Sequence, residues 1–69
     1  MRVVTVDKRK QFADMVYWAL GNLNDDGSYT NRFGVTYRKR DKIAEAMMLD
    51  GMTWANSQVV KYAQRRLTS

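Results

Sequence analysis

The sequence predicts a single α+β domain over residues 1–69, with a short N-terminal strand, a long core helix, a β-ribbon and a C-terminal pair of helices joined by a turn. Three patterns predict it. Apolar residues recur with helical spacing over residues 12–23, and they alternate with polar residues over 28–40. A Gly-Met-Thr break then separates two helix-forming segments near the C-terminus. A chain of 69 residues forms one domain with a small core, which dimerisation could reinforce.

The first part of the chain predicts a strand followed by a helix. The β-branched run over residues 3–6 favours a strand, and the carboxylate of Asp7 can cap the helix that follows. A helix over about residues 8–22, ending at Gly21 or Asn22, is predicted by an apolar stripe. The stripe consists of Phe12, Met15, Val16, Ala19, Leu20 and Leu23. Tyr17 and Trp18 lie beside it, where they widen the core or form a partner surface.

The middle of the chain predicts a β-hairpin. Residues 24–28 have the composition of a turn. Between residues 28 and 40, polar or basic side chains alternate with apolar ones, which is typical of a half-buried ribbon. The apolar side chains stand at odd-numbered positions and belong to Tyr29, Phe33, Val35 and Tyr37. We expect the hairpin turn at residues 31–34, and pairing of the N-terminal strand with residues 35–39.

The last part of the chain predicts two helices. The first covers about residues 42–50, with Asp41 as its cap and Gly51 as a left-handed terminator. The second covers about residues 54–67, with Thr53 as its cap. Its buried side is expected to carry Ala55, Val59, Ala63 and Leu67.

The excess charge lies in the second half of the chain. Residues 1–31 contain four basic and four acidic side chains, whereas residues 32–69 contain eight basic and three acidic ones, for a net charge of 8 − 3 = +5. A charge imbalance on a unit that contains two amphipathic helices points to a polyanion, most often nucleic acid. A solvated basic face without a partner is the competing interpretation.

The last helix has the residue types that read duplex DNA. Asn56, Ser57 and Gln58 lie near its N-terminus, where helices in a major groove usually contact bases, and Lys61 and Arg65 can hold phosphates. Basic residues of the ribbon and of the preceding helix add phosphate contacts. The predicted DNA-contacting residues are Arg32, Arg38, Lys39, Arg40, Lys42, Asn56, Ser57, Gln58, Lys61, Gln64 and Arg65.

Two segments carry a family resemblance. Ile-Ala-Glu-Ala-Met-Met-Leu-Asp-Gly-Met-Thr (43–53) followed by Val-Val-Lys-Tyr-Ala-Gln-Arg-Arg-Leu (59–67) resembles the helix-turn-helix of small bacterial and phage regulators, including winged-helix-like ones. The resemblance covers residues 41–67, with residues 50–53 as the turn. It implies duplex DNA as the partner and transcription regulation as the process. No sequence follows for a C-terminal wing, so the 28–40 ribbon would take that part.

A second resemblance involves the ribbon. Asp-Gly-Ser-Tyr-Thr-Asn-Arg-Phe (26–33) and Arg-Lys-Arg-Asp-Lys-Ile-Ala-Glu-Ala (38–46) are similar to the sheet-plus-helix arm-binding domains of phage integrases. Those domains place a β-sheet against DNA. This resemblance implies that Arg32, Thr36, Arg38 and Arg40 are the DNA readers.

The composition argues against an enzyme. The chain contains no Cys and no His, which removes the thiol nucleophile, the usual zinc ligands and the commonest proton-transfer group. Residues 22–33 partly match a calcium loop, but Phe33 stands where a bidentate Glu is needed. We therefore expect no catalysis, no metal site and no cofactor.

The alternative to DNA is a host protein partner, as for a phage-type inhibitor or adaptor. The chain is rich in the aromatic and Arg residues that dominate interface hot spots. Exposure of Tyr17 and Trp18, or of Trp54, in one patch favours a protein partner, whereas their burial beside an exposed basic stripe favours DNA. No apolar run approaches a membrane span, so we expect no membrane partner, a cytoplasmic protein and possible homodimerisation.

Overall fold

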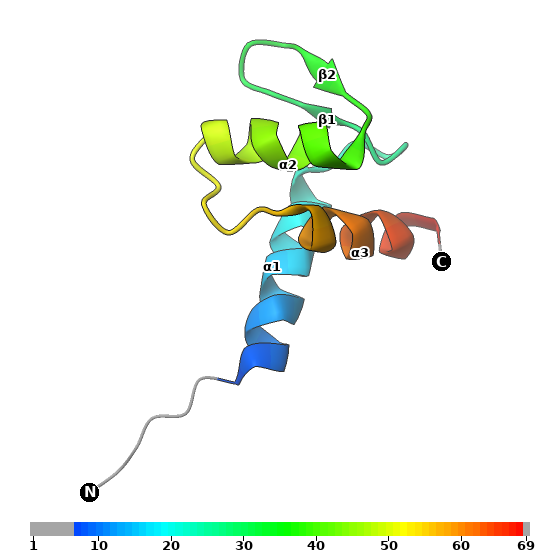
Figure 1. Ribbon diagram of the computed structural model, residues 1–69. Coiled ribbons are helices and arrows are strands. Elements are labelled where there is room, and N and C mark those ends of the chain that lie inside the picture. Colours follow the sequence, from blue (N-terminus) through cyan, green and yellow to red (C-terminus); the bar gives the residue numbers. More distant parts are fainter. Residues whose placement is uncertain (1–6, 69) are drawn as a thin grey trace, which may run out of the picture.

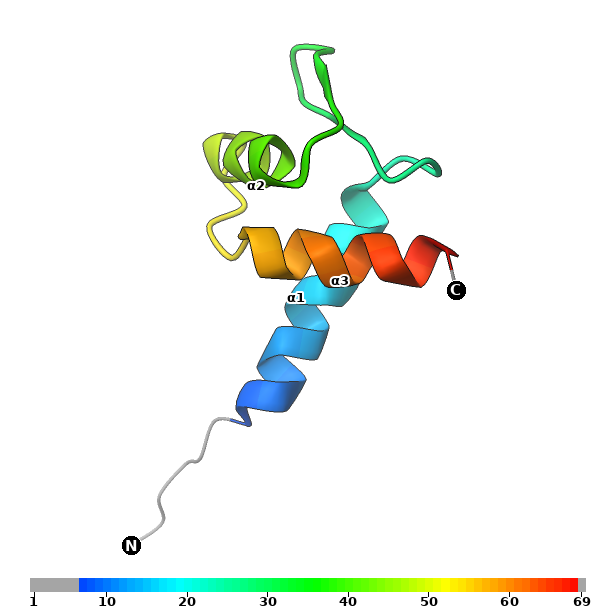
Figure 2. The same cartoon turned by 45° about the vertical axis from the view of Figure 1, so that its right-hand side comes forward.

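The computed structural model describes residues 7–68, which form three helices and a two-stranded antiparallel sheet. In chain order the elements are α1 (Lys8–Asn22), β1 (Tyr29–Thr30), β2 (Thr36–Tyr37), α2 (Arg40–Leu49) and α3 (Ser57–Thr68). α1 crosses α3, α2 lies above α3, and the hairpin stands above α2 (Figures 1 and 2). The α+β class is confirmed, and the predicted strand at residues 3–6 lies outside the described residues.

The first helix begins and ends as the sequence predicts. The side chain of Asp7 accepts hydrogen bonds from the backbone N–H groups of Arg9 and Lys10, which satisfies two donors that have no partner within the helix. The apolar stripe faces inward. Val16 and Ala19 are buried, and the remaining stripe residues pack partly buried against the core.

The hairpin is shorter than the alternating pattern predicts. Tyr29 pairs with Tyr37 and Thr30 pairs with Thr36, so each strand contains only two residues. Tyr29 is buried, as expected from its parity. The prediction is wrong for Phe33 and Val35, whose side chains are exposed. These two residues belong to the turn beyond the paired strands, where side chains no longer alternate between two faces.

The helix pair has a longer connection than predicted. α2 begins at Arg40, so Asp41 lies in the first turn of the helix and is not its cap, contrary to the prediction. Lys39 occupies the cap position and makes no side-chain hydrogen bond there. Gly51 ends α2 at φ +95°, as expected. The N–H groups of Gly51 and Met52 donate to the carbonyls of Met48 and Met47, which is the Schellman arrangement.

The start of α3 differs from the prediction by one turn. The helix begins at Ser57 instead of residue 54, and Thr53 does not cap it. Asn56 takes that place, since its Oδ1 accepts a hydrogen bond from the N–H of Val59 at 3.0 Å. The connection therefore covers residues 50–56, which is longer than the 3–4 residues typical of a helix-turn-helix.

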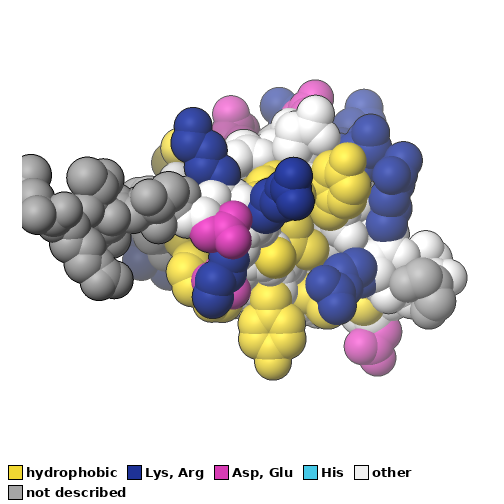
Figure 3. All heavy atoms as spheres, turned by 90° about the horizontal axis from the view of Figure 1, so that it is seen from below, with side chains coloured by type: hydrophobic (Ala, Val, Ile, Leu, Met, Phe, Trp, Pro, Cys, Tyr) yellow, Lys and Arg dark blue, Asp and Glu magenta, His cyan; other side chains and the backbone are white. Residues whose placement is uncertain are grey.

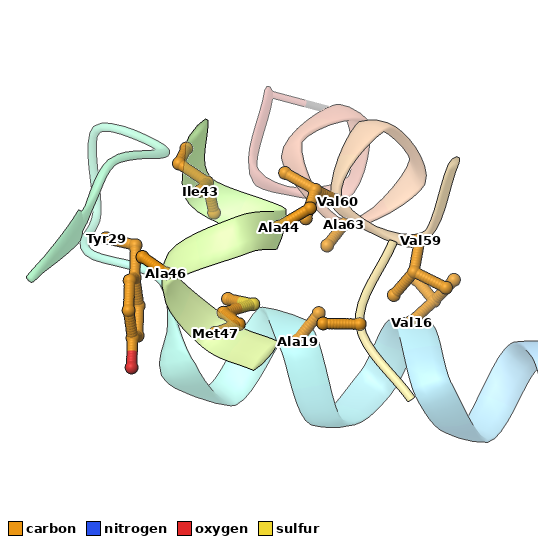
Figure 4. Close-up of a cluster of buried hydrophobic side chains, with 11 residues drawn as sticks. Val16, Ala19, Tyr29, Ile43, Ala44, Ala46, Met47, Val59, Val60 and Ala63 are labelled. Carbon is orange, nitrogen blue, oxygen red and sulfur yellow. The ribbon is translucent and has the colours of Figure 1, made fainter. Parts of the chain in front are cut away.

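The core lies where the three helices meet beneath the hairpin (Figure 4). Its largest fully buried side chains are Ile43 and Met47 of α2 and Val59 and Val60 of α3. Five of the buried side chains are alanines: one in α1, two in α2, one in the connection that follows and one in α3. The buried hydrophobic residues are Val16, Ala19, Tyr29, Ile43, Ala44, Ala46, Met47, Ala55, Val59, Val60 and Ala63.

Candidate nucleic-acid interface

α3 presents one polar, basic side to solvent. Gln58 and Arg65 are exposed and Lys61 is half-buried, and the three residues follow one another at i, i+3 and i+7 along the helix. The opposite side, with Val59 and Ala63, is completely buried. We name Gln58, Lys61 and Arg65 the α3 stripe. The α3 stripe therefore lies on the side of α3 opposite Val59 and Ala63.

A hydrogen bond attaches the start of α3 to the start of α2. The hydroxyl of Ser57 donates to Oδ1 of Asp41 at 2.6 Å. Arg40 and Lys42 flank Asp41 in the sequence and are both exposed. This contact brings the basic first turn of α2 next to the first turn of α3, although the two segments are 16 residues apart. The basic surface is therefore assembled from two helices.

Three residues predicted to contact DNA from the last helix instead make hydrogen bonds within the protein. Asn56 caps the helix, and Ser57 bonds to Asp41. The side-chain amide of Gln64 donates to the carbonyl of Gly27 at 2.9 Å, which ties α3 to the turn before β1. Gln58 is thus the predicted base-reading residue whose amide faces solvent. No sequence pattern indicates the partners of Ser57 and Gln64, because they depend on how the helices pack.

Of the three arginines predicted for the ribbon, Arg40 begins α2 and the other two have partners. Arg32 Nε lies 3.3 Å from Oδ1 of Asp50, and Arg32 also donates to the carbonyl of Leu49. Arg38 donates to Oδ2 of Asp26 at 2.9 Å. These contacts bind the hairpin to its neighbours. Both charges are paired on the surface, so the ribbon contributes less free positive charge than the sequence predicts.

The carboxyl group that pairs with Arg38, that of Asp26, has a lowered pKa. The pKa of Asp26 falls from 3.8 to about 2. The largest causes are hydrogen bonds from the hydroxyl and the N–H of Ser28, and the guanidinium of Arg38 adds to them. Asp26 is therefore ionised throughout the physiological pH range and keeps Arg38 neutralised.

A groove between α1 and α3 borders the α3 stripe, and no pattern in the sequence predicts it. Its apolar wall includes Phe12 and Tyr62, whose rings meet edge to face with centroids 5.4 Å apart. Arg65 lies over the Tyr62 ring at 5.5 Å. Figure 3 shows that Lys and Arg side chains surround apolar ones on the face seen from below. Phe12 and Tyr62 are 50 positions apart, so no local pattern could reveal their contact.

A second surface feature lies on another side of α1. Tyr17 is 68% exposed and Trp18 is 49% exposed, and the ring centroids of Trp18 and Trp54 are 5.7 Å apart. With Gly21 and Asn22 they line a shallow depression, which we name the aromatic hollow. Exposure of Tyr17 and Trp18 in one patch favours a protein partner. The basic stripe is exposed as well, so the protein has two separate candidate surfaces.

The described residues provide few other sites. Residues 7–68 contain no cluster of three or more Asp and Glu side chains arranged to hold a metal ion. Within the same range, no helix has the length and apolar character needed to cross a bilayer. Comparisons with protein-family models, curated proteins and solved structures find no match for this chain. The two family resemblances therefore stay predictions.

Proposed function

We propose that this chain binds duplex DNA through the α3 stripe and the adjacent first turn of α2, and acts as a small regulator or accessory factor without enzymatic activity. The observation that carries the proposal is the joining of two basic segments by the Ser57–Asp41 hydrogen bond. The first turn of α2 has one carboxylate, Asp41, between two exposed basic side chains, and exposed Glu45 follows one turn later. The basic side chains are Lys39, Arg40, Lys42, Lys61 and Arg65.

The residues of this surface divide into two roles. Gln58 offers an amide that can bond bidentately to adenine, and it lies in the first turn of α3, where a helix in the major groove meets base edges. The Lys and Arg side chains supply phosphate contacts, which give affinity without sequence preference. Specificity would therefore reside in α3, and affinity in both helices.

Binding of a fluorescently labelled mixed-sequence duplex, followed by anisotropy over a range of salt concentrations, tests the proposal. Each of Lys61→Ala and Arg65→Ala should lower the slope of log K against log salt by about 0.9, the value for one phosphate contact. Lys10→Ala is the matched control. It removes the same charge, but Lys10 is paired with Asp14 on α1, so the slope should not change.

A second variant tests the local charge balance. Asp41→Asn keeps an acceptor for the hydroxyl of Ser57 and removes the negative charge from the proposed surface. Affinity for the duplex should rise several-fold at low salt. If the wild-type chain does not bind the duplex even at low salt, the DNA proposal is wrong, because a basic binding face makes non-specific contacts there.

The aromatic hollow supports a second candidate, a non-enzymatic protein that binds another protein. Tyr and Trp are the residue types most enriched at interface hot spots, and Tyr17 and Trp18 are both solvent-exposed. Exposed aromatic side chains grouped in one depression are typical of a contact surface. Retention of duplex binding by a Tyr17→Ala variant would assign the two surfaces to separate roles.

A further inference from the structure

We propose that the groove between α1 and α3 binds an acidic peptide segment of another protein, with an apolar side chain of the peptide against the groove wall and a carboxylate on the guanidinium of Arg65. We name this feature the α1–α3 groove. Its lining consists of Phe12, Ala13, Val16, Tyr62, Arg65 and Arg66. It shares no lining residue with the aromatic hollow, and the inference does not depend on DNA binding.

The wall of the groove is apolar and can be reached from solvent. Tyr62 is 42% exposed, and its ring meets that of Phe12 edge to face. Ala13 is exposed beside them on α1, and its small side chain leaves room in the groove, whose volume is about 330 Å³. A large apolar side chain placed there would remove apolar surface of both molecules from water, which favours binding.

The charge of the groove selects a partner that carries carboxylates. Arg65 is exposed and makes no ion pair within residues 7–68, and its guanidinium lies over the Tyr62 ring, next to the apolar wall. No acidic residue lines the groove, and the nearby Asp14 of α1 is paired with Lys10. An incoming carboxylate can therefore bond to the guanidinium, in the bidentate manner that arginine favours, without displacing a carboxylate of the protein.

A peptide fits this combination better than other partners do. Duplex DNA supplies phosphates, but no large apolar group projects from it to cover the wall. Pockets for small ligands usually enclose most of the ligand surface, whereas this groove is open to solvent. A second copy of the chain, with a net charge of +5, is repelled. A peptide with apolar and acidic side chains on one side satisfies both the wall and the arginine, and amphipathic helices commonly bind in apolar grooves.

Selection from a library of short random peptides displayed on phage, against the immobilised full chain without DNA, tests the inference. Enriched peptides should combine Asp or Glu with Leu, Phe or Trp. The matched selection uses Ala13→Gln, which narrows the groove and keeps every charge, so the same peptides should not be enriched. Ala13 is exposed and glutamine is a good helix former, so helix content by circular dichroism should be retained.

Titration of an enriched synthetic peptide, followed by NMR, locates the contact. The methyl signals of Ala13 and Val16 should shift, whereas the indole N–H signals of the two tryptophans, which line the aromatic hollow, should stay in place. Arg65→Gln should raise the dissociation constant about tenfold, because a hydrogen bond between charged groups is lost. Lys61→Gln is the control. It removes a positive charge from the same helix outside the groove, so the constant should change less than about twofold.

A failure to enrich any peptide, or enrichment of peptides without acidic residues, would overturn the inference. Peptides that bind Ala13→Gln as well as the wild-type chain would also overturn it, since the contact would then lie outside the groove. Equal losses of affinity in Arg65→Gln and Lys61→Gln would show that only net charge matters. Duplex binding by Ala13→Gln should keep the wild-type salt slope, so failure of the DNA proposal and failure of this inference are distinguishable.

Discussion

The hydroxyl of Tyr29 donates a hydrogen bond to Oδ2 of Asp50 at 2.5 Å. Tyr29 is in β1 and Asp50 is the C-cap residue of α2, so this bond joins the hairpin to the helix pair. Arg32 approaches the other carboxylate oxygen, and the Asp50 side chain is only 9% exposed. A nearly buried carboxylate thus joins β1 to the end of α2 through two residues that are 21 positions apart.

Replacement of Tyr29 by Phe should lower the free energy of unfolding by about 2 kcal/mol, because a hydrogen bond to a charged and poorly solvated group is lost. Urea unfolding followed by circular dichroism measures the change. Tyr37→Phe is the control, since the Tyr37 hydroxyl makes no hydrogen bond within residues 7–68. Equal losses in the two variants would contradict the importance of the Asp50 contact.

The same contact should make stability fall at high pH. Burial, and then the hydrogen bond to Asp50, raise the pKa of Tyr29 from 10.0 to about 12. Because the folded pKa lies above the unfolded one, the contribution of the neutral hydroxyl is complete below pH 10 and is lost between pH 10 and 12. Ultraviolet absorbance of tyrosinate should show that one of the four tyrosines, Tyr29, ionises with a pKa of about 12. A common midpoint near 10 for all four would refute this.

The turn before β1 should respond to acid. The pKa of Asp26 is lowered to about 2, so its contribution to stability is present above pH 3.8 and is lost as the pH falls towards 2. Carboxyl chemical shifts in an NMR titration report this pKa directly. Ser28→Ala should raise it, because the variant removes the hydroxyl hydrogen bond, which is the largest cause, and keeps the bond from the backbone N–H. An unchanged Asp26 pKa in this variant would contradict the role of the hydroxyl.

Gln64 separates a structural role from a DNA-binding one. Its amide donates to the carbonyl of buried Gly27, so Gln64→Ala should reduce the free energy of unfolding by about 1–2 kcal/mol by leaving that carbonyl without its partner. Thermal unfolding measures the loss. Affinity for the duplex at a fixed salt concentration should stay at the wild-type value, because the side-chain amide is bonded to the turn. Reduced affinity with unchanged stability would restore Gln64 as a DNA contact.

Local patterns were sufficient wherever a few neighbouring residues decide the conformation. The spacing of apolar residues predicted α1, and the carboxylate of Asp7 predicted its start. Gly51 predicted the end of α2, because a left-handed φ favours glycine. The hairpin turn also lies where the sequence places it, with the N–H of Gly34 bonded to the carbonyl of Asn31. In these cases the controlling hydrogen bonds join residues a few positions apart.

The sequence by itself determined the helices, the hairpin and the amount of charge, because periodicity and capping are local properties. Tertiary structure decided where α3 begins: residues 54–56 lie outside the helix, where Ala55 is buried and Trp54 contacts Trp18. It also decided which polar side chains of α3 remain free. Gly27 and Asp41 engage Gln64 and Ser57, and no spacing within α3 can encode partners that packing brings from elsewhere in the chain.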